Sequence, residues 1–358
     1  MKRLTYWLMT ALTGWIALKS LRAEGEAAVA AAGDPRRFRR LEGGRDRGRA
    51  ADHPADIPPP GWKDILIRTY RSISDDRVFA LAAGVTYYVL LALFPGLAAL
   101  VSIYGMIANP GDIGTLVASL HGTIPEGAIS IISDQLHHLA SQNQKALGLA
   151  FFGSLLVSLW SANAAIKALF DALNVVYGEK EKRGFVRLTI LSLSFTIGMI
   201  LFLVLAMIGI IVVPAILNLL YLGTWSALIL SVLRWPALLV VLVFGLAVVY
   251  RYGPSRHDAR WRWISWGSVA AAILWLVVSM LFSWYASNFG NYNKTYGSLG
   301  AVAGFMVWTW LSITVVLMGG ELNAEIEHQT ARDSTTGPPK PLGARGAKMA
   351  DTIGAAQD

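Results

Sequence analysis

The sequence predicts an all-α membrane protein, a polytopic bundle of about six core transmembrane helices. Of its 358 residues, 54% are hydrophobic and only 15% are charged, whereas soluble domains carry about 25% charged residues. The charges are also clustered, and apolar runs long enough to cross a bilayer, about 20 residues, lie between the clusters. In lipid each backbone polar group needs a partner within the protein, so these runs are predicted to be helices.

Six apolar runs are predicted to be membrane spans, each bounded by charged or polar residues. They cover about 78–108, 146–170, 188–217, 235–252, 263–285 and 299–322. Pro95 lies inside the first run and favours a kink there, because proline removes a backbone hydrogen-bond donor.

The basic residues alternate along the chain in a way that orients the bundle. They gather before the first run, in 177–187 and in 251–262, whereas the intervening connections are nearly bare of them. Because basic loops stay on the cytoplasmic side of a membrane, both ends of the six-helix core are predicted to be cytoplasmic. The same loops account for the net charge of +8 without a nucleic-acid partner.

Four parts are predicted along the chain: 1–21, 22–60, 61–329 and 330–358. Residues 1–21 form a short hydrophobic segment with three interpretations: an additional helix, a signal-like anchor or a misassigned start; a short membrane-associated helix is favoured. Residues 22–60, rich in Arg, Ala, Gly and Pro, are predicted to be a disordered cytoplasmic linker whose arginines contact anionic headgroups. The membrane domain covers 61–329, and 330–358 is predicted to be a disordered cytoplasmic tail.

An interfacial helix is predicted before the first span, at 61–77. Apolar and basic residues alternate there at helical spacing, which is typical of a helix lying along a membrane surface. One face is expected to carry Trp62, Ile65, Leu66, Thr69 and Ile73, with Lys63, Arg68 and Arg71 lying elsewhere.

Short motifs in order along the chain resemble a known family. They are Asp75-Asp76-Arg77, Thr86-Tyr87-Tyr88, Leu93-Phe94-Pro95, Trp160-Ser161-Ala162-Asn163, Tyr296-Gly297-Ser298-Leu299-Gly300 and Gly319-Gly320-Glu321-Leu322-Asn323-Ala324. Together they resemble the YihY/BrkB family of inner-membrane proteins, whose older members carry a ribonuclease BN label. The resemblance covers about 62–329 and implies six helices in the bacterial inner membrane. Gly320 departs from the more usual Ala of the family, which implies closer helix packing and no change in chemistry.

A polar stripe is predicted on the second span, formed by Asn163, Lys167, Asp171 and Asn174. Their spacing of four, four and three residues places them on one helical face. A polar face within an apolar helix favours protein or water over lipid, so one interpretation is the lining of a cavity open to the cytoplasm. The alternative is a Lys167 side chain that extends to the membrane surface while Asn163 bonds a neighbouring helix.

Two acids, Glu321 and Glu325, lie one turn apart at the end of the sixth span, at the expected depth of Lys167. The topology therefore predicts a Lys167–Glu321 ion pair that closes the cytoplasmic side of the bundle. The alternative is an ordinary helix end with solvated acids.

Two further groups of residues are candidates for functional roles. Tyr87 and Tyr88 lie inside the first span, where their hydroxyls are expected to find partners on another helix. On the outer side, a short polar turn enters the sixth span, and a structural role is favoured over an outer gate. Its residues are Asn293, Tyr296, Gly297 and Ser298.

The remaining sequence signals narrow the chemistry. There are no cysteines, the six histidines are scattered, and no Walker-type phosphate loop is present, so no metal, no cofactor and no ATP-driven step are expected. The family resemblance connects individual members with serum resistance and envelope lipid export. The favoured function is a non-ATP-driven transporter or exporter of a lipid or amphiphile that contributes to envelope integrity, with membrane lipids as partners. A non-transporting scaffold for envelope assembly is the alternative, and a ribonuclease is the least favoured.

Overall fold

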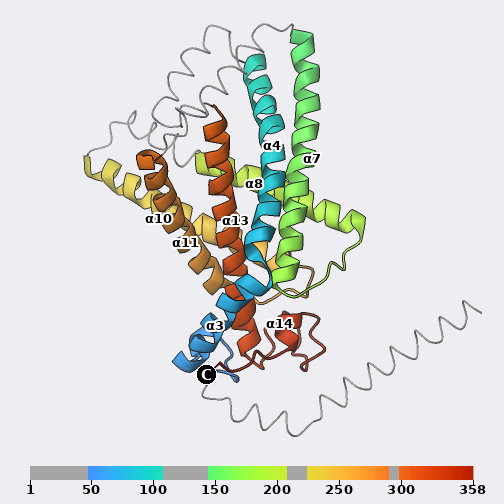
Figure 1. The fold of residues 1–358 in the computed structure, drawn as a ribbon, viewed down its shortest axis with the longest axis vertical. Helices are drawn as coiled ribbons and strands as arrows, with labels where there is room; N and C mark the ends of the chain where they lie inside the picture. The colour runs from blue at the N-terminus through green and yellow to red at the C-terminus, as the bar shows by residue number, and fades with distance from the viewer. Residues whose placement is uncertain (1–46, 108–143, 208–223, 290–297, 358) are drawn as a thin grey trace, which may run out of the picture. The chain divides into compact units, whose positions relative to one another are not determined.

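The computed structural model describes residues 47–107, 144–207, 224–289 and 298–357, which form helices joined by turns and loops (Figure 1). In chain order these are the short 3-10 helix η2 (Pro54–Asp56), α3 (Pro59–Asp75), α4 (Val78–Ile107), α7 (Gln144–Val176), α8 (Phe185–Met207), α10 (Thr224–Tyr252), α11 (Trp261–Phe289), α13 (Ser298–Gln329) and α14 (Lys348–Asp351). The predicted all-α class is confirmed.

The six predicted spans correspond in order to α4, α7, α8, α10, α11 and α13. Within the described ranges, four stretches are long and apolar enough to cross a membrane: Leu155–Val176, Phe185–Phe202, Trp261–Asn288 and Val302–Gln329. The bent pair Pro59–Asp75 and Val78–Leu93, at 58° to each other, makes a fifth if it counts as one span. The apolar part of α10 is shorter, Pro236–Tyr252. A polytopic helical membrane protein is confirmed, and the sixth span stays a prediction.

The described residues belong to two compact units. Of the described residues, the first unit comprises 47–68, Arg256–Trp263 and 324–357, and the second comprises 69–107, 144–207, 224–255, 264–289 and 298–323. The second unit therefore holds nearly all of the apolar helices, and the first is built from segments before α4, around the connection between α10 and α11, and after Asn323.

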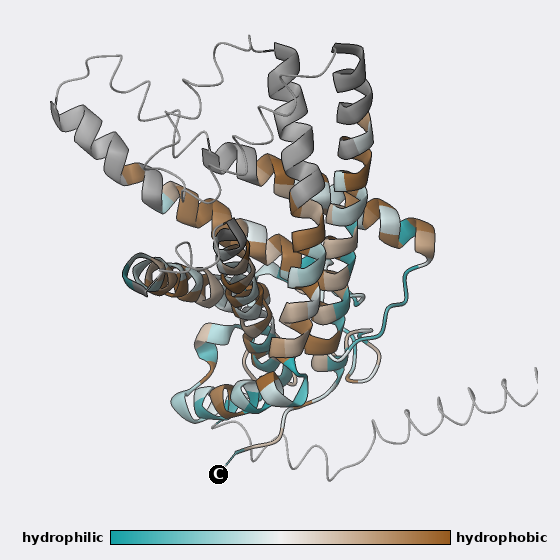
Figure 2. Cartoon of the chain, turned by 45° about the horizontal axis from the view of Figure 1, so that its top comes forward, coloured by the Kyte–Doolittle hydropathy of each residue, from teal (hydrophilic) through white to brown (hydrophobic). Residues whose placement is uncertain are grey.

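In the second unit, α4 packs along α7, and α7 also contacts α8 (Figure 1). The buried residues Val78, Ala82 and Val85 recur at three- and four-residue spacing on α4, so one face of this helix is covered by its neighbours. Exposed Phe79 and Leu91 give α4 an apolar outer side as well, and many of the coloured residues of these helices are brown in Figure 2. On α8, exposed Ile190 and Ile197 illustrate an apolar outer surface of the kind that lipid covers.

Glycines bring α11 and α13 into close contact. A Cβ added to Gly267 would lie 2.3 Å from the carbonyl oxygen of Gly319, so only glycine fits there. The backbone N–H of Gly267 donates to the Asn323 Oδ1 atom at 2.8 Å, which adds a polar bond to the contact. Gly320 lies on another side of α13, where an added Cβ would come within 3.2 Å of Val176 on α7. The Gly319-Gly320 pair thus lets α13 approach two helices closely, as small residues do in membrane bundles.

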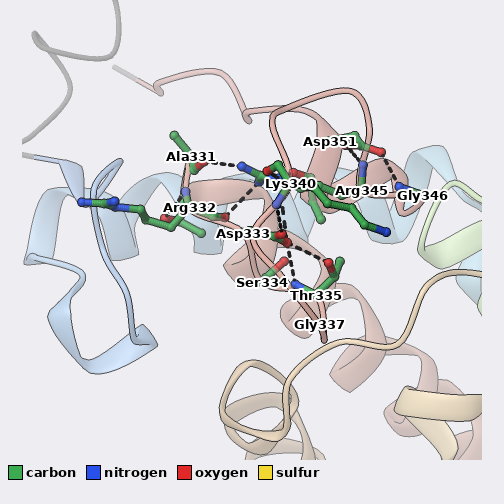
Figure 3. A network of polar contacts seen from close by, with 12 residues as sticks. Ala331, Arg332, Asp333, Ser334, Thr335, Gly337, Lys340, Arg345, Gly346 and Asp351 are labelled. Carbon is green, nitrogen blue, oxygen red and sulfur yellow. Dashed lines mark hydrogen bonds and ion pairs between the residues drawn. The ribbon is translucent and has the colours of Figure 1, made fainter.

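In the first unit, residues 330–357 are folded, which corrects the prediction of a disordered tail. Arg345 is 3% exposed, and its guanidinium donates to the carbonyl oxygens of Ala331 and Arg332 (Figure 3) and to that of Ala350. Around it, the Asp351 carboxylate accepts hydrogen bonds from three backbone N–H groups of the same loop. The segment has few large apolar residues, so composition predicts disorder, but this polar network holds it together instead.

The preceding linker is also partly folded in the first unit. The backbone N–H of Ala331 donates to the Arg49 carbonyl at 2.8 Å, and the Thr330 hydroxyl donates to the Ala51 carbonyl at 2.7 Å. Residues 47–60 are therefore held by the end of α13 rather than disordered as predicted. Residues 1–21 and 22–46 lie outside the described residues.

Candidate functional site

The polar stripe of α7 does not present one uniform surface. Asn163 and Asn174 are buried, Lys167 is half-buried and Asp171 is exposed. Each four-residue step on a helix drifts by roughly 40°, so Asp171 lies about 80° around the axis from Asn163, whereas Asn174 returns to within about 20° of it. The covered part of the polar stripe therefore consists of buried Asn163 and Asn174 and half-buried Lys167, and Asp171 lies outside it.

Lys167 contacts the start of α8. Its ammonium donates to the Thr189 hydroxyl at 3.0 Å and lies 5.2 Å from the centre of the Phe185 ring. Within the described ranges, no ion pair joins Lys167 to a carboxylate, so the predicted Lys167–Glu321 pair is not formed.

The register of α13 against α7 explains this correction. Gly320, the neighbour of Glu321, packs against Leu173 and Val176. Leu173 is six residues beyond Lys167, which corresponds to roughly 9 Å along the helix axis. Hydropathy predicts the depth of Lys167 and Glu321 in the membrane only to within a few turns. In the structure, the residue next to Glu321 contacts α7 at Leu173 and not at Lys167.

Asn163 is buried on the same face, one turn before Lys167. Its side-chain oxygen Oδ1 has no hydrogen-bond partner within the part of the chain that the structure describes. A buried amide oxygen usually has a partner, which can be water or a ligand. Asn163 and Lys167 together place an acceptor and a cation in the second apolar helix, where polar groups are costly unless they serve a purpose.

Asn174 has a different role from the one predicted. Its Oδ1 atom accepts from the backbone N–H of Ser255 at 2.6 Å, and its Nδ2 atom donates to Glu181 at 3.1 Å. The Ser255 hydroxyl in turn accepts from the backbone N–H of Lys182 at 2.9 Å. Asn174 therefore ties the connection after α7 to the connection after α10.

Arg183 completes this arrangement. Its guanidinium donates to Glu181 at 2.7 Å and to the Gly253 carbonyl at 2.8 Å, and it lies over the Phe170 ring at 5.3 Å. We call Asn174, Glu181, Arg183 and Ser255 the loop clamp. Sequence reasoning used the charges of 177–187 only as a topology signal, and nothing in their spacing indicated these cross-loop bonds.

The electrostatics of the loop clamp centre on Glu181. Burial alone would raise the pKa of its carboxyl, but hydrogen bonds from the Arg183 side chain, the Arg183 backbone and Asn174 outweigh it. They hold the pKa of Glu181 at about 2 instead of the usual 4.5. The carboxylate is therefore charged at every physiological pH, and the loop clamp stays closed over that range.

The two acids at the end of α13 are both buried, so the alternative of a solvated helix end is wrong. Glu321 is 1% exposed and follows the glycine pair directly. Glu325 belongs to the first unit, where it forms an ion pair with Arg68. Arg68 also donates to the Gln329 side chain at 2.8 Å and to the Ala355 carbonyl at 2.9 Å. Glu325 thus holds the first unit together.

Tyr87 and Tyr88 are exposed on α4, and their rings meet edge to face at 5.5 Å. The partners expected on another helix are not found among the described residues, so these tyrosines lie on the apolar outer surface. Of the predicted outer turn, Ser298 is the first residue of α13. Asn293, Tyr296 and Gly297 lie outside the described residues.

Comparison with known proteins now decides the family. The family model described as Virulence factor BrkB matches residues 69–342, which include every helix from α4 to α13. The chain belongs to the BrkB family. This confirms the YihY/BrkB resemblance of the sequence motifs.

Relatives of the BrkB family carry two kinds of name. The chain is 30% identical over 252 residues to the "Putative ribonuclease-like protein YfkH" of Bacillus subtilis, covering 68% of this chain and 88% of that protein. It is 28% identical over 273 residues to the "UPF0761 membrane protein NMB0524" of Neisseria meningitidis serogroup B, covering 72% of this chain and 62% of that relative. A "UPF0761 membrane protein VP0125" of Vibrio parahaemolyticus is 26% identical over 270 residues, covering 72% and 81%. No solved structure matches the chain.

Proposed function

We propose that this BrkB-family protein is a transporter that exports an anionic lipid or other amphiphile across the bacterial inner membrane without ATP, and so contributes to envelope integrity. Both ends of the helical core are cytoplasmic in this proposal, in line with the basic segments before α4, in 177–187 and in 251–262. The absence of a Walker-type loop from the sequence favours a process driven by a gradient.

The environment of Lys167 carries the proposal. Its ammonium has three N–H donors, and the Thr189 hydroxyl accepts from it at 3.0 Å without neutralising its charge. A phosphate or carboxylate headgroup could use the remaining donors, because an ammonium binds such groups as a compact point charge. The neighbouring Oδ1 atom of Asn163 could accept from a hydroxyl of the same headgroup.

The surface beside Lys167 fits the apolar part of such a molecule. Phe185 forms one side of the ammonium contact and is itself largely exposed, as are Ile190 and Ile197 further along α8. A headgroup at Lys167 with acyl chains along α8 would keep its charge beside the cation and its chains in an apolar environment.

Lipid translocation in proteoliposomes tests this proposal. Fluorescent phosphatidylglycerol is reconstituted with wild type, Lys167→Ala, Lys167→Arg or Lys180→Ala, and a membrane-impermeant reductant reports the rate at which the lipid crosses. We expect Lys167→Ala to slow crossing by roughly tenfold, the value of one charge-assisted hydrogen bond. Lys167→Arg should retain a large part of the rate, and Lys180→Ala, which removes an exposed lysine, should match wild type. Equal rates in Lys167→Ala and wild type, or a wild-type rate equal to that of empty liposomes, would contradict the proposal.

The loop clamp favours a second candidate, a non-transporting scaffold for envelope assembly. Asn174, predicted to line a cavity, instead bonds Ser255 and Glu181, which closes this end of α7 against movement. A scaffold would show no lipid crossing in the same liposomes. A ribonuclease, the class named by the Bacillus relative, would release nucleotides from RNA when the purified protein is supplied with divalent metal.

A further inference from the structure

Helix α3 has one face buried in protein and an opposite face open to the surroundings. Asp64, Ile65 and Arg68 are buried, whereas Leu66 is 57% exposed and Tyr70 is 78% exposed. The sequence placed Ile65 and Leu66 together on the apolar membrane face. The structure separates them, because Ile65 packs into protein and Leu66 points outward.

Polar bonds on the inner side fix this orientation. The Asp64 carboxylate accepts from the Arg47 guanidinium and from the backbone N–H of Gln357, both at 2.8 Å. One turn later, Arg68 pairs with Glu325 and donates to the Gln329 side chain. A rotation of α3 about its axis would break these bonds, so the outward face is set by the fold.

The outward face combines apolar and basic side chains. Lys63, Leu66 and Tyr70 are exposed and follow one another at three- and four-residue spacing along a single continuous helix, and exposed Arg71 lies beside this face, next to Tyr70 in sequence. Large apolar side chains flanked by cations are the pattern of a helix that lies in a membrane interface. Tyrosine is itself enriched at the level of the lipid headgroups, because its ring is apolar and its hydroxyl is polar.

The chain connection keeps α3 close to the start of the apolar helix α4. Only Asp76 and Arg77 separate α3 from the apolar helix α4, and the two helices are bent by 58° to each other. Arg77 has a positive φ of 52°, which turns the chain sharply at this point. Because only two residues separate the helices, the last turn of α3 lies next to the point where the apolar helix α4 begins.

We propose that the outward face of α3 is a binding surface for anionic phospholipid headgroups of the adjacent leaflet. Lys63 and Arg71 contact the phosphates, and Leu66 and Tyr70 enter the boundary between headgroups and acyl chains. The surface does not involve Lys167, so it holds whether or not the protein transports lipid.

The absence of cysteines allows a direct measurement of depth. Single-cysteine variants Tyr70→Cys and Lys348→Cys of the full chain are labelled with the same small fluorophore and placed in nanodiscs. Lys348 is an exposed lysine of the tail and serves as the matched control. We expect brominated phospholipid to quench the label at position 70 and aqueous iodide to quench the label at position 348. Strong iodide quenching with no bromolipid quenching at position 70 would overturn the proposal.

Headgroup charge is tested on the same labelled chain. Equal fractions of brominated phosphatidylglycerol or brominated phosphatidylcholine are compared as quenchers at position 70. We expect phosphatidylglycerol to be enriched roughly fivefold for each basic residue at the surface. Lys63→Glu should remove most of this preference and Lys348→Glu should leave it unchanged, with circular dichroism confirming equal helix content. Equal quenching by the two lipids in the wild-type background would leave a zwitterionic interface and overturn the anionic assignment.

Discussion

The Oδ1 atom of Asn174 accepts a 2.6 Å hydrogen bond from the backbone N–H of Ser255, across 81 residues of sequence. The bond joins the last turns of α7 to the segment that follows α10. Ser255 is buried, and among the described residues the acceptor of its N–H is this one side chain.

Replacing this amide should therefore destabilise the second unit. We expect Asn174→Ala to lower the free energy of unfolding by about 1–3 kcal/mol, since it leaves a buried N–H without its acceptor. Thermal unfolding in detergent, followed by circular dichroism, measures the loss. Asp171→Ala, an exposed change on the same helix, is the control and should unfold within experimental error of wild type.

The Glu181 carboxylate should make stability depend on pH. Its pKa is about 2 in the folded chain and 4.5 as the reference value, so its contribution is present in full above pH 4.5 and disappears as pH falls toward 2. We expect Glu181→Gln to be less stable than wild type at pH 7, with the difference narrowing between pH 4.5 and pH 2. A difference in melting temperature that stays constant through this range would show that the carboxylate charge does not stabilise the loop clamp.

The glycine contact between α11 and α13 should not tolerate a methyl group. A Cβ at Gly267 would come within 2.3 Å of a backbone oxygen, so Gly267→Ala has to push the helices apart. We expect a loss of about 1–3 kcal/mol or more in the free energy of unfolding.

Gly304, on the same helix as Gly319, provides the matched control. An added Cβ there meets nothing within 4 Å, so Gly304→Ala should be neutral or slightly stabilising through its higher helix propensity. Comparable losses in Gly267→Ala and Gly304→Ala would mean that the close contact is not what matters.

Arg345 should decide whether the tail stays folded. Its side chain satisfies several carbonyl groups at once, so Arg345→Ala leaves them without a donor (Figure 3). We expect proteinase K, whose cleavage does not depend on arginine, to cut 330–357 at least several times faster in this variant, with the melting of the helices unchanged. Arg332→Ala removes an arginine whose side chain is largely exposed, and the tail of that variant should be cut at the wild-type rate.

Hydropathy and basic-residue alternation predict the order and approximate bounds of α4 to α13, because each of these properties is local along the chain. The partner of Lys167 cannot be predicted from such local properties. It depends on the register of α13 against α7, and the contact of Gly320 with Leu173 sets that register. No local sequence pattern encodes this contact.

The other differences have a similar origin. Composition indicates disorder for the tail because it measures apolar content, whereas Arg345 and Asp351 stabilise the tail through hydrogen bonds. For α3, spacing identifies the exposed and buried faces only approximately, and the bonds of Asp64 and Arg68 fix which side is covered.

The Asp64 carboxylate is bonded to the backbone of Gln357, 293 residues later in the chain. During synthesis, Asp64 and Arg68 emerge from the ribosome long before Glu325, Ala355 and Gln357 exist to bind them. The first unit can close only after the six apolar helices that separate these two ends of the unit in sequence have been synthesised. Until Glu325 and Gln357 have been made, Arg68 and Asp64 of α3 lack the partners that accompany their burial.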